Sequence, residues 1–268
     1  MGAAMHRAAH QLLNRPLVFE DPLALPIIGA EAQLRGGDWH GFATPALRAF
    51  IVARARHTED ILAGAVARGI QQYVLLGAGL DTYAYRRGGD RPRVFEVDHP
   101  ATQAWKRARL DDAGIAVPAN LVFVPVDFEH ESLSTGLKSA GFDFKSPAVV
   151  AWLGVTAYLA RETAMATLGV LAAGLQAGSD IVFDYGEPVE ARDPALRARF
   201  EALSARVAKA GEPFRSFFNP EEMACDLRTL GFSQICDLDA PALDARYFAG
   251  RDDGLRTAGV GHCLHARV

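Results

Sequence analysis

Hydrophobic positions along the chain follow helical spacing first and short apolar runs afterwards. From Pro45 to about Arg68 the apolar residues recur at helical spacing, which predicts a long helix ended by Gly69. Beyond it, apolar runs typical of buried strands alternate with helical patterns. The predicted strands are 72–76, 93–97, 121–125, 148–152 and 180–183, and the predicted helices between them are 101–113, 132–140 and 161–173. This alternation is typical of right-handed βαβ crossovers and of a parallel sheet with helices on both faces.

The segments on either side of this pattern complete the predicted architecture. Prolines and glycines break residues 1–45 into short helical pieces, which we expect to cover the core. Residues 46–190 form the predicted cofactor-binding core, 191–230 a helical lid over the substrate, and 231–268 the last strands, the final one antiparallel at the sheet edge. The sequence therefore predicts a single domain over 1–268: a doubly wound, mostly parallel seven-stranded α/β sheet with an antiparallel edge strand.

Composition narrows the classes of protein that fit this pattern. Half of the 268 residues are hydrophobic, 22% are charged and the formal net charge is −4, as in ordinary globular proteins. Lysine and arginine are scattered, so we expect no nucleic-acid partner, and the acidic balance disfavours an anionic membrane surface. No apolar stretch approaches the roughly 20 residues of a membrane span. We expect a cytoplasmic protein with a small-molecule partner, and homo-oligomer formation stays open.

Cysteine and histidine do not indicate a metal site. The three cysteines, Cys225, Cys236 and Cys263, are far apart and odd in number, which argues against a disulfide framework or a zinc knuckle. We expect them to be buried thiols. His262 and His265 flank Cys263, but strand alternation places His262 on the opposite face from the other two. We therefore expect no bound metal.

A glycine turn follows the first predicted strand. Gly77-Ala78-Gly79 ends the apolar run 74–76, and glycines let a backbone turn tightly and approach a ligand closely. Ligands of doubly wound sheets bind beyond the carboxyl ends of the strands. Thr82 stands where the dinucleotide fingerprint has its third glycine, which weighs against NAD. A nicotinamide-dependent oxidoreductase shares the turn and stays an alternative.

Acidic residues end the second and third predicted strands. Glu96 and Asp98 follow the glycine turn by about 20 residues, where a carboxylate can accept both hydroxyls of an adenosine ribose. Both side chains point to the same side of an ideal strand, so their positions alone do not choose between them. Asp127 is placed to receive an adenine amino group, and Phe128 to pack against the ring. Three such loops at one end of the sheet indicate a site for an adenosine-containing cofactor.

Several segments spread over residues 15–190 share one resemblance. They are Arg15-Pro16, Asp21–Ala24, Val52–Arg56, Leu76–Thr82, Phe95–Asp98, Val126–Phe128 and Trp152–Leu159. Together they resemble the leucine carboxyl methyltransferase-like family, which includes eukaryotic phosphatase carboxyl methyltransferases and bacterial members that methylate polyketides. The resemblance implies a Rossmann-like class I methyltransferase fold with S-adenosyl-L-methionine as cofactor.

The resemblance also implies roles for individual residues. Arg54 would hold the carboxylate of the methionine part of the cofactor, which suits a guanidinium fork, and Asp98, not Glu96, would bind the ribose. Tyr158 and Tyr185 are candidates for the acceptor side, the latter because 184–188 leaves the fifth predicted strand towards it. The full set that the resemblance places at the cofactor is Arg54, Gly77, Ala78, Gly79, Asp98, His99, Asp127, Phe128 and Leu153.

The sequence gives less direct evidence for the identity of the methyl acceptor than for the cofactor. In the protein-methylating members a glutamate occupies the place of Leu153, so a protein carboxyl terminus is a less favoured acceptor here. No His–Asp pair stands out in the sequence as a general base. A carboxylate is ionised at pH 7 and needs none, whereas a phenol with a pKa of about 10 would benefit from one. We therefore predict O-methylation of a small-molecule carboxyl group, or of a phenolic hydroxyl, in polyketide or other secondary metabolism. A non-catalytic S-adenosylmethionine-binding protein is the second alternative.

Overall fold

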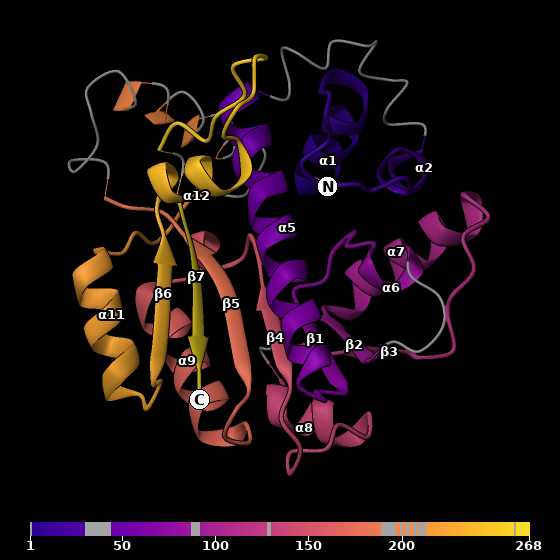
Figure 1. The fold of residues 1–268 in the computed structure, drawn as a ribbon. Helices are drawn as coiled ribbons and strands as arrows, with labels where there is room; N and C mark the ends of the chain where they lie inside the picture. The colour runs from indigo at the N-terminus through magenta and orange to yellow at the C-terminus, as the bar shows by residue number, and fades with distance from the viewer. Residues whose placement is uncertain are drawn as a thin grey trace.

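A single seven-stranded sheet organises the fold (Figure 1). The computed structural model describes residues 2–29, 44–86, 92–127, 130–188, 213–259 and 261–268, together with a few residues between 197 and 208. The strands are β1 (Gln72–Leu76), β2 (Arg93–Asp98), β3 (Leu121–Pro125), β4 (Val149–Trp152), β5 (Asp180–Tyr185), β6 (Gln234–Leu238) and β7 (His262–Arg267).

The strand order is β3-β2-β1-β4-β5-β7-β6. Strands β1 to β5 are parallel to one another, and β7 is antiparallel to both β5 and β6. This confirms the predicted mostly parallel, doubly wound α/β sheet. The strand order changes direction between β1 and β4, and ligands of such sheets bind beyond the carboxyl ends of the strands at this switch point.

The antiparallel strand lies one place further in than the predicted edge position. β7 pairs with β5 on one side and with β6 on the other, so β6 forms the edge. Cys263, Leu264 and Ala266 of β7 are fully buried, as suits a strand with neighbours on both sides. Every residue of β6 is at least partly exposed, which suits an edge.

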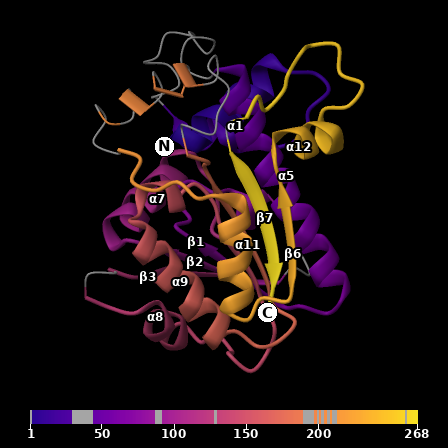
Figure 2. The same cartoon turned by 90° about the vertical axis from the view of Figure 1, so that its left-hand side faces the viewer.

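Helices cover both faces of the sheet (Figure 2). Helix α5 packs on one face and α9 and α11 pack on the other. The predicted end of α5 is confirmed, because Gly69 adopts a positive φ of 94° and the Ile70 amide donates to the Ala65 carbonyl at 3.1 Å. The helices are α1 (Gly2–Leu13), α2 (Ala24–Ile28), α5 (Pro45–Ala67), α6 (Tyr83–Arg86), α7 (Pro100–Asp112), α8 (Leu133–Ser139), α9 (Arg161–Gly174), α11 (Pro220–Thr229) and α12 (Ala240–Tyr247), with a 3-10 turn η1 (Thr156–Tyr158).

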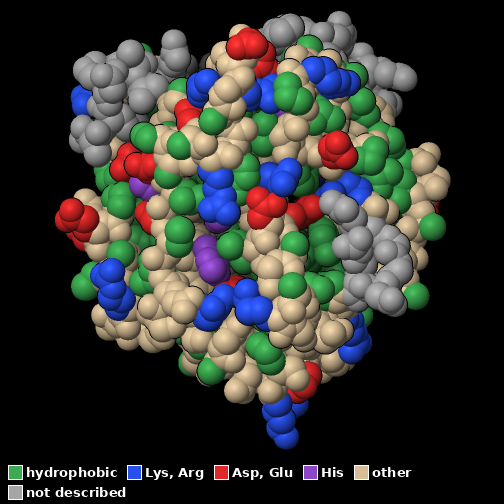
Figure 3. Space-filling model, in the orientation of Figure 1, with side chains coloured by type: hydrophobic (Ala, Val, Ile, Leu, Met, Phe, Trp, Pro, Cys, Tyr) green, Lys and Arg blue, Asp and Glu red, His purple; other side chains and the backbone are tan. Residues whose placement is uncertain are grey.

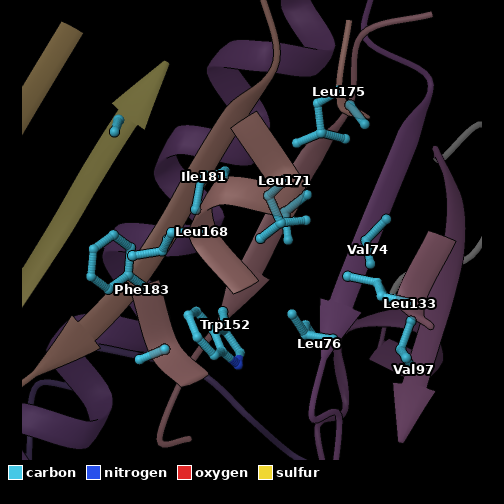
Figure 4. Close-up of a cluster of buried hydrophobic side chains, with 14 of the residues drawn as sticks. Val74, Leu76, Val97, Leu133, Trp152, Leu168, Leu171, Leu175, Ile181 and Phe183 are labelled. Carbon is cyan, nitrogen blue, oxygen red and sulfur yellow. The ribbon is translucent and has the colours of Figure 1, made fainter. Parts of the chain in front are cut away.

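The larger core cluster lies between the sheet and the α9 and α11 layer (Figure 4). Trp152 and Phe183 stand side by side on β4 and β5, with ring centroids 6.4 Å apart. Leu168 and Leu171 of α9 pack onto them, and all four side chains are at most 3% exposed. Burial of this apolar area is the main stabilising contribution to the fold.

Part of the predicted lid belongs to this layer instead. Met223 and Leu227 of α11 are buried in the larger core cluster, so the helix covers the sheet and does not lie over a substrate. Its amphipathic pattern fits either role, because a lid helix and a covering helix both need one apolar face. Most of the predicted lid before residue 213 lies outside the described residues.

The surface carries charges of both signs. On the face shown in Figure 3, basic and acidic side chains are interspersed. No described helix is long and apolar enough to cross a membrane. Cys263 is buried as expected, but Cys225 and Cys236 are exposed, because they lie on the outer side of α11 and on the edge strand β6. Among the described residues, no group of histidine, cysteine and acidic side chains could hold a metal ion.

Candidate active site

The glycine turn lies at the carboxyl end of β1. The amides of Gly77 and Ala78 both donate to the Val97 carbonyl of β2, at 2.9 and 3.1 Å. Gly77 has a positive φ of 71°, and a Cβ there would lie 2.6 Å from a Val155 methyl group, so only glycine fits. Gly79 also has a positive φ, of 46°, but no heavy atom of the described residues lies within 4 Å of its Cβ position. The turn therefore opens towards a ligand at Gly79.

The two acidic residues of β2 have different surroundings. Asp98 is half-buried, and its carboxylate accepts hydrogen bonds from the Gly79 amide at 2.6 Å and the His99 amide at 2.8 Å. Glu96 is 1% exposed and forms an ion pair with Lys106 Nζ at 2.7 Å. Burial raises the pKa of Glu96, and the Lys106 ammonium acts in the opposite direction. Only Asp98 is therefore available to a ligand at the glycine turn.

Asp127 and His99 stand next to Asp98. The His99 imidazole is exposed, and its Nε2 lies 3.9 Å from a half-buried Asp127 carboxylate oxygen. His99 also caps α7, because its Nδ1 accepts from the Ala101 amide at 3.2 Å. Phe128 lies outside the described residues. Carboxylates therefore follow both β2 and β3 at the same end of the sheet, as predicted.

Arg54 reaches the carboxyl end of the sheet from the middle of α5. Its guanidinium is buried and donates to the carboxylate of Asp184 on β5. The other Asp184 oxygen accepts from the Gly154 amide at 2.5 Å. A Cβ at Gly154 would lie 2.8 Å from Arg54 Nη2, so this glycine makes room for the guanidinium. Asp184 is a partner that the sequence did not reveal, although a buried arginine on a helix needs an acid.

The N-terminal segment covers the glycine turn. Figure 1 shows α1 and α2 beyond the carboxyl ends of the parallel strands. Arg7 of α1 donates to the Leu80 carbonyl at 2.6 Å and to the Asp21 carboxylate at 2.8 Å. Leu80 itself packs in a cluster with α1, α2 and α7. This placement agrees with the cover expected over the core.

Leu153 and Tyr158 lie after β4, at the same end of the sheet. Leu153 is half-buried and packs against the apolar face of α5. Tyr158 is half-buried in η1, with its ring 5.6 Å from that of Phe214. The segment 213–218 is joined to this region by the Arg215 amide, which donates to the Ala157 carbonyl at 2.7 Å.

Tyr185 ends β5 in a more enclosed position. It is 2% exposed, and its hydroxyl donates to the Asp237 carboxylate of β6. Its ring stacks on His262 of β7 at 4.8 Å between centroids. His262 Nδ1 in turn lies 3.1 Å from the same Asp237 carboxylate, and its Nε2 lies 3.3 Å from Glu187. The sequence did not reveal this His–Asp pair, because the register of two strands distant in sequence brings it together.

Arg86 of α6 joins elements of the fold. It forms a buried ion pair with Glu59 of α5, lies 3.6 Å from Asp21, and packs over the Phe19 ring. These contacts join the N-terminal segment, α5 and α6.

A family model described as leucine carboxyl methyltransferase matches residues 1–172. This match takes in the glycine turn, Asp98, Asp127, Arg54 and Gly154. The chain belongs to the leucine carboxyl methyltransferase family. Two relatives are similar to the chain beyond the residues that the family model matches.

Both relatives are bacterial members named as methyltransferases. One is the "Putative S-adenosyl-L-methionine-dependent methyltransferase YktD" of Bacillus subtilis, 34% identical over 217 residues, which are 80% of this chain and 71% of that protein. A protein of Mycolicibacterium paratuberculosis with the same description is 34% identical, over 76% of this chain and 70% of its own.

Solved structures share the fold at low sequence identity. A DUF574 family protein from Streptomyces avermitilis is 16% identical with a TM-score of 0.59, covering all of this chain and 97% of its own. The apo form of the S-adenosylmethionine-dependent methyltransferase SibL is 15% identical with a TM-score of 0.51, covering all of this chain and 69% of its own. These similarities support the Rossmann-like class I fold.

Proposed function

We propose that this leucine carboxyl methyltransferase family member transfers the methyl group of S-adenosylmethionine to an oxygen atom of a small-molecule acceptor, preferably a carboxyl oxygen. Family membership carries the methyltransferase activity and the cofactor. What we propose beyond family membership is that the accepting atom is an oxygen and that the acceptor is a small molecule. The observation that carries it is the convergence of Gly79, Asp98 and Arg54 at one end of the sheet, with an apolar, partly aromatic region beside them.

The residues present fit the cofactor. S-adenosylmethionine offers a ribose diol, an adenine amino group and a carboxylate. Asp98 and Asp127 supply the carboxylates for the first two, and Arg54 supplies a guanidinium for the third. Gly79 leaves open space beside Asp98 where a side chain would stand. Arg54 already pairs with Asp184, which fixes the guanidinium at the carboxyl end of β5.

Methyl transfer requires the protein mainly to orient the acceptor relative to the methyl group. The cofactor supplies an electrophilic methyl group. This chain has to align an acceptor lone pair and exclude water, which are effects of position. An acceptor carboxylate is ionised near neutral pH, so no proton has to be removed.

The region beside Arg54 supports a small acceptor. Leu153 occupies the place of the glutamate in the protein-methylating members that the sequence resembles, and it packs against α5. Tyr158, Phe214, Phe200 and Phe217 form a chain of ring contacts between 5.5 and 5.6 Å. These rings supply apolar contact for an acceptor with an aromatic or aliphatic body.

Labelled methyl transfer to a panel of aromatic acids, phenols and short peptides tests the proposal. We expect base-labile methyl esters on small acids. Their rate of formation should stay constant from about pH 6 to 8, unless a residue that binds the cofactor or the acceptor titrates in this range. A phenol methylated without a base would instead speed up about tenfold per pH unit below its pKa. Base-stable ethers or peptide products alone contradict the carboxyl preference. Cofactor binding without turnover on the whole panel indicates the non-catalytic alternative.

A further inference from the structure

A second ionisable cluster lies at the same end of the sheet as the cofactor residues. It consists of Tyr185, Glu187, Asp237 and His262. His262 is the centre, with its Nδ1 3.1 Å from Asp237 Oδ2 and its Nε2 3.3 Å from Glu187 Oε1. Tyr185 stacks on the imidazole and donates its hydroxyl to the same Asp237 oxygen. Both nitrogens and one face of the imidazole are therefore held in place.

The topology places this cluster on the acceptor side. Asp98 and the glycine turn lie on β2 and β1, whereas Tyr185, His262 and Asp237 lie on β5, β7 and β6. Neighbouring strands are about 4.8 Å apart, so His262 is roughly 10 Å from the carboxyl end of β4 along the sheet. The backbone of 213–218 joins the two regions, because the Phe218 amide donates to the Gly186 carbonyl at 2.9 Å.

The cluster resembles an anion-binding site whose position is occupied by a carboxylate of the protein itself, that of Glu187. Asp237 and Glu187 both raise the pKa of His262 against the effect of burial, which favours the protonated imidazole. The His262 side chain is 9% exposed and Glu187 is 33% exposed, so Glu187 forms the outer layer. Asp237 holds the inner nitrogen, and the outer nitrogen faces a carboxylate that can exchange with another carboxylate.

We infer that His262 is the specificity-determining residue for the acceptor: its Nε2–H binds a carboxylate of the acceptor in the position that Glu187 occupies here. Asp237 and Tyr185 are positioning residues that fix the imidazole. This inference rests on the proposed function and deepens it. A site for a carboxylate needs a hydrogen-bond donor whose position is fixed, and Asp237 holds Nδ1 of His262 so that Nε2 faces the outer carboxylate.

Two substitutions at the cluster should act in opposite directions. H262Q keeps a hydrogen-bonding side chain but removes the charge, and should weaken binding of a carboxylate probe about tenfold. E187Q removes the competing carboxylate and should tighten the binding of the same probe at pH 6; because Glu187 also raises the pKa of His262, the gain should be smaller at pH 7.5. D237N should lower the pKa of His262 and weaken probe binding at pH 7.5 more than at pH 6.

The experiment follows the imidazole signal of His262 by two-dimensional NMR. The signal is assigned by its loss in H262Q, among the eight histidines of the chain. Protein saturated with S-adenosylhomocysteine is titrated with benzoate and 2-naphthoate, with benzamide and 2-naphthamide as neutral counterparts of the same shape. At least one acid should shift the His262 signal while its amide does not, and its affinity should fall as pH rises through the pKa of His262.

Failure of both acids to move the His262 signal overturns the inference. Acid binding that is unchanged in H262Q, or weakened in E187Q, also overturns it. Methyl transfer to phenols that loses kcat in H262Q at unchanged KM would make His262 a general base, which likewise contradicts the inference. Calorimetry with S-adenosylhomocysteine separates the two proposals. Absence of that binding contradicts the proposed function, whereas normal binding with an unresponsive His262 contradicts this inference alone.

Discussion

Glu96 and Asp98 stand two positions apart on β2, yet the fold gives their carboxylates opposite surroundings. Strand alternation puts both on one side of the sheet. Glu96 lies deeper and is neutralised by Lys106, whereas Asp98 reaches the end of the strand and binds the amide of Gly79. Depth along the strand, and not the face, separates the buried, ion-paired carboxylate of Glu96 from the more exposed carboxylate of Asp98.

Matched substitutions at these two positions should separate binding from stability. Asp98→Asn should weaken S-adenosylhomocysteine binding by about 1.5 to 3 kcal/mol, because it removes a charged hydrogen-bond acceptor. Its melting temperature should change little. Glu96→Gln should lower the free energy of unfolding by about 3 kcal/mol or more, because Lys106 is left buried without its partner. Calorimetry and thermal melting measure the two effects, and equal losses of affinity in both variants would contradict the assignment of Asp98.

Arg54 balances the buried Asp184 carboxylate and is also the residue that we propose for the cofactor carboxylate, so its removal should affect both stability and binding. Arg54→Ala leaves the Asp184 carboxylate buried and uncompensated, and should destabilise the fold by about 3 kcal/mol. The double variant Arg54→Ala with Asp184→Asn removes that charge and should recover part of the stability. Cofactor binding should stay weak in both variants, because neither has the guanidinium. Recovery of wild-type affinity in the double variant would show that Arg54 only balances Asp184.

At the scale of elements, α1 is tied to the segment of the glycine turn by the hydrogen bond from Arg7 and by apolar packing against Leu80. Arg7→Ala should loosen this cover, because Asp21 is fully buried and its next cation, Arg86, is 3.6 Å away. We expect faster hydrogen exchange in α1 and in residues 77–80, and a loss of about 3 kcal/mol of stability. Arg15→Ala removes an exposed arginine of the same segment and serves as the control. Unchanged hydrogen exchange at residues 77–80 in Arg7→Ala would contradict the idea that Arg7 helps to hold the glycine turn in place.

The elements show where sequence reasoning succeeds. Strands β1 to β5 and helices α7, α8 and α9 follow from hydrophobic periodicity, because buried strands and covering helices have different spacing. The order of β6 and β7 does not follow from it. It is set by the pairing of β7 with β5, which is distant in sequence. Helix α12 was not predicted, since it is short and only Leu243 is buried.

The candidate site likewise contains residues whose position could be predicted from the sequence and residues whose position could not. The glycine turn, Asp98 and Asp127 could be predicted because each lies next to its own strand end, where position along the chain already fixes position in the sheet. The Arg54–Asp184 and His262–Asp237 pairs could not, because each joins residues from separate elements. Their signal in the sequence is only a charged residue within an apolar pattern.

At the scale of the whole molecule, we expect two buried histidines to contribute to the loss of stability in acid. His10 is fully buried, and its Nε2 accepts from the Val18 amide at 3.0 Å while its Nδ1 contacts the Asn14 amide oxygen. Both nitrogens are therefore used by the neutral form, and protonation would break the bond to Val18. His57 is 1% exposed and contacts the Tyr247 hydroxyl at 3.0 Å. Burial lowers the pKa of each histidine to about 4.

The sign of the resulting pH dependence follows from these two lowered pKa values. Above about pH 6.5 both histidines are neutral in the folded and unfolded states, so they contribute nothing to the change with pH. As the pH falls from 6.5 towards 4, the unfolded chain takes up protons that the folded protein excludes, and stability is lost. Each histidine accounts for about 3 kcal/mol of that loss by pH 4. His262 acts in a different pH range: because its pKa is raised, its contribution to stability is gained as the pH falls to about 6.5 and is then present throughout the range in which the other two histidines destabilise the fold.

Urea unfolding measured between pH 4 and 7.5 tests this account. The free energy of unfolding should fall steeply below about pH 6.5, and His57→Gln should reduce the fall by about 3 kcal/mol. The readout is the change with pH, because the substitution itself can lower stability at every pH. His130→Gln removes an exposed imidazole and should keep the wild-type dependence. If His57→Gln shows the same loss between pH 6.5 and 4 as the wild type, then His57 does not stay neutral in the folded protein and another group causes the acid sensitivity.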